Sequence, residues 1–167
     1  IKPEIVVLNI SEKDLNSGKI REVQKEVERY YLKKGFPDKV KILSLCGTIE
    51  IELARLEPEV KKVFLDDLGI HESAMYKLIK TCYDLLGLIS FITVNNNELR
   101  AWTIKKGTNA LKAAGKVHSD MERGFIKAEV INFETFISLK SMVKAKEKGL
   151  IRLEGKSYEV KDGDIIN

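Results

Sequence analysis

Residues 98–131 read ELRAWTIKKGTNALKAAGKVHSDMERGFIKAEVI and hold the densest set of specific residue choices in the chain. Residues 99–104 predict a strand, in which the two-residue period places Trp102 and Ile104 on one face together with Arg100. The chain returns through residues 124–131, where apolar and charged residues alternate. A strand, a short helix and a returning strand together predict a compact β-grasp-like unit.

The segment between these two strands carries its own signals. A basic turn is expected at residues 105–107, which read Lys-Lys-Gly. Thr108 can cap a short helix over residues 110–114, where alanine is a good helix former. Gly115 follows at the position where a left-handed residue ends many helices. We therefore expect the helix to end at Gly115.

Length and composition bound the class of protein. A chain of 167 residues with 44% hydrophobic residues can bury a core and hold one domain or two small ones. No apolar run approaches the length of a membrane span and the N-terminus has no signal-peptide pattern, so we expect a cytoplasmic protein without a membrane partner. Two cysteines, Cys46 and Cys82, predict neither a disulfide framework nor a metal site.

The formal net charge of +4 is unevenly distributed. Residues 1–86 carry 15 Lys or Arg against 15 Asp or Glu, whereas residues 87–167 carry 14 against 10. A basic second half favours an anionic partner such as RNA. On charge alone, ordinary solvated lysines explain the excess equally well.

The first half alternates strands and helices. The expected elements are a strand at 5–8, a helix at 17–34, a strand at 40–45 and a helix at 49–56. The apolar run at 5–8 predicts a strand buried on both faces of a parallel sheet. The loops that follow the two strands, residues 9–12 and 46–50, should then meet at one edge of the sheet, where ligands of such sheets bind.

Two further helices are expected before the second half. One begins at Pro58 and carries an apolar stripe, and the other covers residues 72–86. The stripe of the first helix is expected to consist of Val60, Val63, Phe64 and Leu68. His71 is expected to begin the second helix rather than to act in catalysis. A hairpin then follows, with strands at 88–94 and 98–104 and an asparagine turn at 95–97.

Residues 133–148 predict one helix with Phe136, Leu139 and Val143 facing inward. Three lysines at four-residue spacing, Lys140, Lys144 and Lys148, would then form a basic ridge. Contact with RNA or a ribosome is one interpretation of this ridge, and a solvated helix face is the alternative. His118 and Asp120 lie close in sequence, but no nucleophile or metal partner accompanies them, so no catalytic residue is predicted.

Residues 149–157 read GLIRLEGKS and superficially resemble a phosphate-binding loop. That motif needs four residues between its glycines, and here there are five. Residues 151–153 and 158–160 instead predict two strands of a hairpin that turns at Gly155-Lys156. The segment is therefore not expected to bind phosphate.

The second half resembles the TGS domain of the YchF family, the Obg-like ATPases. The resemblance rests on residues 100–108, on Ala113-Ala114-Gly115, on His118 and Asp120, and on residues 124–126. It departs from the family pattern at Leu111-Lys112, where Pro-Gln is usual, and at Met121, where Phe is usual. The same domain type occurs in threonyl-tRNA synthetases, Obg-related GTPases and stringent-response enzymes.

The resemblance also implies a role for the two loops of the first half. GTPases carry Asn-Lys-x-Asp after the first of these strands, and this chain has Asn9-Ile10-Ser11-Glu12. Glu is one methylene longer than Asp and would not hold the same bidentate contact with guanine, whereas Asn9 can pair with adenine. The implied base-binding residues are Asn9, Ile10, Glu12, Cys46 and Gly47. Two alternatives remain open. Glu12 could simply mark the end of the strand, and Cys46 could be a small buried residue.

The overall expectation is an α/β fold in two parts. Residues 1–86 would form the C-terminal part of a P-loop NTPase (G-domain-like) sheet with connecting helices, and residues 87–167 a β-grasp TGS domain without its last strand. Both ends look cut. The resemblance implies that the full-length protein binds and hydrolyses ATP, or GTP, with Mg²⁺ bound upstream of this chain, and that it associates with ribosomes or RNA. The chain alone is expected to bind no cofactor and to be inactive.

Charge placement identifies a group of candidate RNA- or ribosome-facing residues. They are Arg100, Lys105, Lys106, Arg123, Lys127, Lys140, Lys144 and Lys148. The competing interpretation is a non-enzymatic β-grasp module that binds RNA or protein, with the first half as scaffold. The editing region of a tRNA synthetase is disfavoured, because TGS domains in those enzymes have no preceding α/β half.

Overall fold

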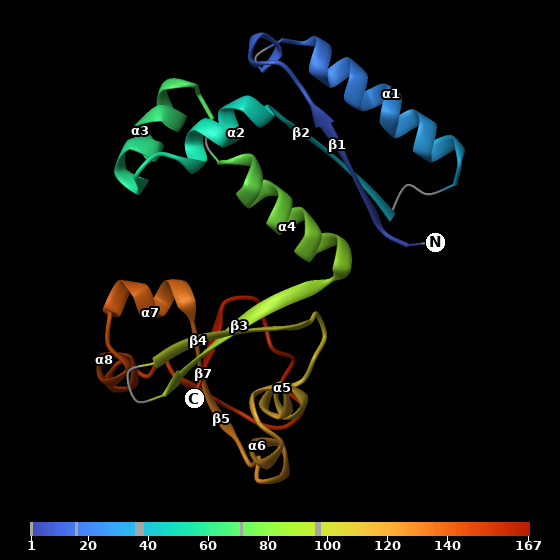
Figure 1. Cartoon of the computed structure of the whole chain (residues 1–167). Helices are drawn as coiled ribbons and strands as arrows, with labels where there is room; N and C mark the ends of the chain where they lie inside the picture. The colour runs from blue at the N-terminus through green and yellow to red at the C-terminus, as the bar shows by residue number, and fades with distance from the viewer. Residues whose placement is uncertain (1, 16, 36–38, 71, 96–97) are drawn as a thin grey trace. The chain divides into compact units, whose positions relative to one another are not determined.

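The computed structural model describes residues 2–15, 17–35, 39–70, 72–95 and 98–167. The chain divides into two compact units, Ile1–Leu86 and Gly87–Asn167 (Figure 1). Each unit has its own sheet and its own core. No helix in the described parts of the chain is long and apolar enough to cross a bilayer.

The first unit is built on a parallel pair of strands, β1 (Glu4–Asn9) and β2 (Val40–Leu45). The one-turn helix η1 (Glu12–Asp14) follows β1, and α1 (Lys19–Lys33) connects the two strands. Contrary to expectation, β1 is not buried on both faces, and Val7 is 43% exposed. Among the described residues only β2 pairs with β1, so one edge and part of one face remain open to solvent.

The core of this unit lies around α2 (Gly47–Ala54) and α3 (Pro58–Asp67). Cys46, Ile49 and Leu53 are buried there, and side chains of α3 pack against them. The expected apolar stripe of α3 is rotated by about one residue, because its partly buried positions are Lys61, Phe64, Leu65 and Leu68. These follow the i, i+3, i+4, i+7 spacing of one helix face, which leaves Val60 and Val63 exposed.

The helix α4 (Ala74–Leu86) follows and begins two residues later than the expected 72–86. The carboxylate of Glu50 in α2 accepts hydrogen bonds from the backbone N–H groups of Ala74 (2.7 Å) and Met75 (3.4 Å). Because the first N–H groups of a helix have no partner within it, Glu50 fixes where α4 begins. His71, expected at this helix start, lies outside the described residues.

The second unit has a five-stranded mixed sheet in the order β4-β3-β7-β5-β6. Strand β3 runs parallel to β7, and the other neighbours are antiparallel. The strands are β3 (Leu88–Asn95), β4 (Glu98–Lys105), β5 (Ala128–Asn132), β6 (Arg152–Glu154) and β7 (Asp164–Ile166). Strand β7, at the end of this chain, pairs with β3 and β5, and the expectation that the domain lacks its last strand stays a prediction. The expected hairpin of β3 and β4 forms, but Asn95, expected in the turn, is the last residue of β3 and pairs with Glu98. Asn96 and Asn97 lie outside the described residues.

Helices cover both faces of this sheet (Figure 1). On one face, α5 (Ala110–Val117) packs with Ile89, Phe91 and Ile104, and α6 (Ser119–Arg123) follows it. On the other, α7 (Phe133–Leu139) and α8 (Met142–Glu147) pack over Ile131 and Ile165. The two-residue period of the strands separates the apolar residues into these two cores.

Helix α5 begins and ends differently from the sequence prediction. Asn109 is the cap, and its side-chain oxygen accepts from the Lys112 N–H at 3.0 Å. Thr108 instead donates to the Lys105 carbonyl at 2.6 Å. Gly115 does not end α5, which continues to Val117. A Cβ at Gly115 would collide with the side chain of Glu122 in α6, so the glycine lets these two helices approach each other.

The single helix expected at 133–148 is broken into α7 and α8. Lys140 ends α7 in the left-handed region (φ 51°), and the Ser141 hydroxyl caps α8 by accepting from the Lys144 N–H. Phe136 and Ala145 are nine residues apart, which is about half a turn out of phase in a continuous helix at roughly 100° per residue. Breaking the helix lets both contact the same core, while Val143, expected inside, is 67% exposed.

The hairpin expected at 151–160 does not form. Strand β6 (Arg152–Glu154) pairs with β5, and Glu159 instead bridges to Asn109 before α5. Residues 156 and 157 form the turn between these two segments. No helix follows this turn before β7, so it lacks the strand-to-helix setting of a phosphate-binding loop.

Candidate functional sites

The loops after β1 and β2 meet at the carboxyl edge of the two strands. The Ile10 N–H donates to the Leu45 carbonyl at 2.8 Å, so pairing continues past the end of β1. The Asn9 side-chain oxygen accepts from the Gly47 N–H at 3.1 Å. This bond ties the first residue of α2 to the last residue of β1, and it fixes the orientation of the Asn9 amide.

Gly47 leaves little room beside Asn9. A Cβ at Gly47 would lie 3.3 Å from the Asn9 oxygen, which is tighter than ordinary contact, so a larger residue would push the two loops apart. Cys46 is 4% exposed and belongs to the core formed with Ile49 and Leu53. Its side chain faces away from solvent, and only its backbone could contribute to a ligand site.

Glu12 begins the one-turn helix η1 and is exposed. Within the described part of the chain, its carboxylate has no hydrogen-bond or ion-pair partner. The neighbouring Ser11 hydroxyl donates to Asp14 at 2.6 Å and closes the turn. Asn9, Ile10 and Gly47 are thus brought together at one edge, and Glu12 follows three residues after Asn9 with its charge available.

The second unit contains a groove of about 900 Å³ between the sheet and the α5–α6 pair. Its lining is mainly apolar and includes Phe91, Trp102, Val117, Phe125 and Ile126. Of the eight basic candidates, Arg100 and Lys127 both line this groove. The Arg100 guanidinium lies 4.4 Å from the centre of the Trp102 ring, a cation–π arrangement.

The other basic candidates lie elsewhere in the unit. Lys105 ends β4, and Lys106 donates its N–H to the Gly87 carbonyl at 2.8 Å. Arg123 pairs with Asp120 at 3.2 Å, and His118 lies 3.5 Å from the same carboxylate. The expected lysine ridge is wrong as a single helix face, because Lys140 ends α7, Lys144 lies in α8 and Lys148 follows α8.

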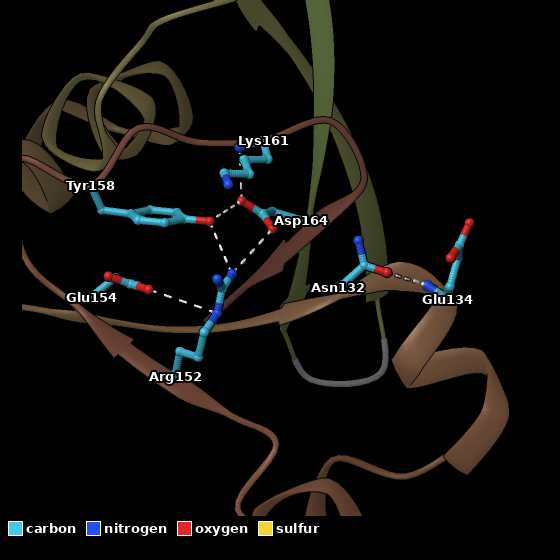
Figure 2. Close-up of polar contacts among 7 residues, drawn as sticks. All are labelled: Asn132, Glu134, Arg152, Glu154, Tyr158, Lys161 and Asp164. Carbon is cyan, nitrogen blue, oxygen red and sulfur yellow. Dashed lines mark hydrogen bonds and ion pairs between the residues drawn. The ribbon is translucent and has the colours of Figure 1, made fainter.

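A polar cluster around Asp164 was not predicted from the sequence (Figure 2). Asp164 is 1% exposed, and one of its oxygens accepts from the Tyr158 hydroxyl and from the Lys161 N–H, both at 2.8 Å. Its other oxygen lies 3.7 Å from the Arg152 guanidinium, which also donates to Tyr158 at 3.0 Å and approaches Glu154. The pKa of Tyr158 is raised, first by burial and then by its bond to Asp164.

This cluster anchors the last part of the chain. It joins β6, the loop at 155–163 and the first residue of β7. Nearby, the Asn132 side chain accepts from the Glu134 N–H at 2.9 Å and caps α7 (Figure 2). The only sequence signal was the run Asp162-Gly163-Asp164, which is common in turns and does not distinguish a buried carboxylate from an exposed one.

Comparison with known proteins places the chain in a family. Residues 88–167 match the family model YchF-GTPase_C, described as a protein of unknown function (DUF933). The ribosome-binding ATPase YchF of Mycoplasma genitalium is 44% identical over 167 residues, covering 99% of this chain and 45% of the relative. The chain belongs to the YchF family. The YchF protein of Bacillus subtilis is 43% identical, with 99% of this chain and 44% of the relative covered.

A solved YchF structure has the same fold. The Schizosaccharomyces pombe YchF GTPase matches with a TM-score of 0.81 and 27% identity, covering 99% of this chain and 43% of that one. The match extends over both units, so the mixed α/β architecture is that of a YchF protein. The chain spans less than half the length of these YchF relatives and corresponds to their C-terminal portion.

Proposed function

We propose that this chain is the base-binding and ribosome-facing portion of a nucleotide hydrolase that uses ATP, or GTP. The relatives are named ribosome-binding ATPases, and the solved homologue is named a GTPase. The observation that carries the nucleotide role is the hydrogen bond between Asn9 and Gly47, which ties together the two loops at the carboxyl edge of β1 and β2. Ligands of open α/β sheets bind at this kind of edge.

We propose a role for each side of the Asn9 amide. Its oxygen already accepts the Gly47 N–H, so the amide NH₂ is left to donate to an acceptor on a purine ring. Backbone groups at Ile10 and Gly47 would complete the contact with the base. We propose that Glu12, with its longer side chain, relaxes the selectivity for guanine and allows adenine.

We propose that phosphate and magnesium are bound by a part of the protein outside this chain. The described residues contain no group of three or more His, Cys, Asp or Glu side chains placed to hold a metal ion. Catalysis of phosphoryl transfer depends on phosphate positioning and on positive charge at the phosphates. We therefore expect this chain alone to hydrolyse neither ATP nor GTP. Separately, the expected cytoplasmic location stays a prediction.

For the second unit we propose a β-grasp TGS domain that contacts ribosomal RNA or another RNA. Three features support this assignment: the strand order, the parallel pair β3 and β7 in the middle of the sheet, and α5 lying across one face. Its net positive charge suits an anionic partner. The groove beside Trp102 also favours a second candidate function, a binding module that acts without nucleotide.

Substitution of Glu12 tests the nucleotide role. In a protein that also carries the phosphate-binding part, E12D should raise affinity for GTP relative to ATP by on the order of tenfold, since a shorter carboxylate restores the guanine contact. Asn9→Ala should weaken the binding of both ATP and GTP. E26D, on an exposed position of α1, is the matched control and should change neither. A wild-type protein that binds only GTP, or an E12D protein with an unchanged ratio, would contradict the assignment.

A further inference from the structure

The groove of the second unit adjoins the hairpin of β3 and β4, whose strands are longer than the helix α5 that packs on it. Strand β4 has eight residues and spans about 26 Å, whereas α5 also has eight residues but spans only roughly 12 Å. Helix α6 adds five residues, of which Asp120 and Met121 line the groove. Part of this sheet face therefore forms a groove wall beside the core that α5 covers, with the partly buried Trp102 on the wall and Phe91 in the core behind it.

A cation–π pair of Arg100 and Trp102 lies in this groove. The Trp102 indole N–H donates to the Thr93 hydroxyl at 2.9 Å, which holds the ring in one orientation. The Arg100 guanidinium lies over that ring at 4.4 Å from its centre. Both side chains come from the edge strand β4, and both line the groove. A guanidinium held against an indole offers a flat, positively charged surface.

The charges in the groove are only partly compensated. Arg100 and Lys127 have no ion-pair partner among the residues that the structure describes. Two carboxylates line the groove, those of Glu98 and Asp120. Asp120 lies within ion-pair distance of Arg123 and His118, so Glu98 is the carboxylate that could still offset the charge of Arg100 or Lys127. Ile126 stands beside Lys127 and is 81% exposed. The groove thus combines apolar walls, a stacking surface and two available cations.

We propose that this groove binds an unpaired nucleotide of a single-stranded RNA. The base packs against the stack of Arg100 and Trp102, and a neighbouring phosphate pairs with Lys127. Unpaired bases stack on aromatic rings and on guanidinium planes, and lysine neutralises the backbone. An acidic peptide would use the cations but has no flat group to fill the stacking surface. The inference rests on the proposed association with RNA and names its site.

The chain supplies its own reporter, because Trp102 is its single tryptophan. The 167-residue chain is titrated with a single-stranded RNA of about ten nucleotides, a site size typical of such grooves, at about 50 mM salt. A duplex of the same length and a glutamate-rich peptide are titrated in parallel. We expect a saturable change of Trp102 emission with the single strand and much weaker effects with the other two ligands.

Variants test whether the groove itself is responsible. R100Q should weaken binding of the single strand on the order of tenfold by removing the cation from the stacking surface. K127Q should lower the salt dependence by about one phosphate contact. Ile126→Glu places a carboxylate at the exposed mouth without touching the core, and should weaken binding more than Ile126→Gln. K156Q removes a cation from an exposed position outside the groove and should leave affinity within about twofold of wild type.

Failure of the groove and failure of RNA association give different results. If the single strand binds but neither changes Trp102 emission nor responds to R100Q and I126E, the groove is not its site, although RNA association stands. If no RNA binds even at low salt, both proposals are wrong. Binding of the glutamate-rich peptide at least as tightly as of RNA would overturn the inference in favour of a protein partner.

Discussion

Replacing Asp164 by Asn should destabilise the second unit strongly for so small a change. The side chain is fully buried, and one oxygen accepts from both the Tyr158 hydroxyl and the Lys161 N–H. The amide of Asn can keep its oxygen at that position and preserve both bonds. Its NH₂ group would then face the Arg152 guanidinium, 3.7 Å from the oxygen that it replaces. The substitution therefore removes charge while retaining shape.

The size of the effect follows from the two retained bonds. Hydrogen bonds to a charged acceptor contribute about 1.5–3 kcal/mol, against about 0.5–1.5 kcal/mol for neutral partners. Two bonds each weakened by about 1 kcal/mol lower the free energy of unfolding by about 2 kcal/mol. Asp164→Ala removes both acceptors, leaves the Lys161 N–H unpaired in the protein interior, and should cost about 4 kcal/mol.

Urea unfolding followed by Trp102 fluorescence measures this loss. Trp102 is the single tryptophan and lies in the second unit, so its signal reports that unit even if the first unfolds separately. In a thermal experiment, about 2 kcal/mol corresponds to a fall in melting temperature of roughly 8–16 °C for a unit of this size. Glu159→Gln, which removes the same charge from an exposed position, is the control.

The expected order of stability is wild type, then Glu159→Gln close to it, then Asp164→Asn, then Asp164→Ala. If Asp164→Asn stays within about 0.5 kcal/mol of Glu159→Gln, the charge of Asp164 does not hold the cluster together. In that case the loop at 155–163 must be anchored by apolar packing, for example by buried Val160.

Three further predictions concern other parts of the fold. Because the pKa of Tyr158 is raised in the folded state, the free energy of unfolding should fall as pH rises above about 10. Tyr158→Phe should make this fall less steep in urea unfolding measured at successive pH values. An equally steep fall in the variant and the wild type would contradict the prediction. Lys140→Gly should increase the free energy of unfolding of the second unit by about 1 kcal/mol and raise its melting temperature, because Lys140 has a positive φ that glycine adopts without strain. Lys140→Gln should change neither quantity. Glu50→Ala should destabilise the first unit by about 1–2 kcal/mol in circular dichroism by uncapping α4, with exposed Glu52→Ala as the neutral comparison.

Local pattern predicted most of the elements, because strands and helices of this chain are strongly periodic. The hairpin of β3 and β4 and the strand-helix-strand order of the first unit follow from alternation and from turn residues. Membership of the YchF family also followed from residues 100–126, and the relatives confirm it. What periodicity could not give was which helix face is buried, as the rotated stripe of α3 shows.

The sequence contained a sign of the break between α7 and α8, but the regular lysine spacing pointed more strongly to one continuous helix. Lysines at four-residue spacing favour one helix, but the apolar residues Phe136 and Ala145 are out of phase in such a helix. Ser141 is a good cap, and only tertiary contact with Ile131 and Ile165 decides that it acts as one. The groove beside Trp102 could not be predicted, since it depends on how α5 and α6 pack against the longer hairpin of β3 and β4.

The candidate base site was predicted as a set of residues, and the structure adds their arrangement. Sequence could name Asn9 and Gly47, but the hydrogen bond between them depends on the pairing of β1 with β2. Cys46 was open between a ligand contact and a buried residue, and its side chain is in the core. Whether these residues bind a nucleotide stays a proposal.

The most direct test of that proposal is an NMR titration of a YchF protein that carries this chain and its phosphate-binding part. ATP and GTP are added separately, and the amide signals of Asn9, Ile10 and Gly47 are followed, including the Asn9 side-chain NH₂. We expect saturable shifts of these signals with ATP at least as large as those with GTP. Unchanged signals in all three residues while ATP binds tightly would show that the base lies elsewhere and would contradict the account.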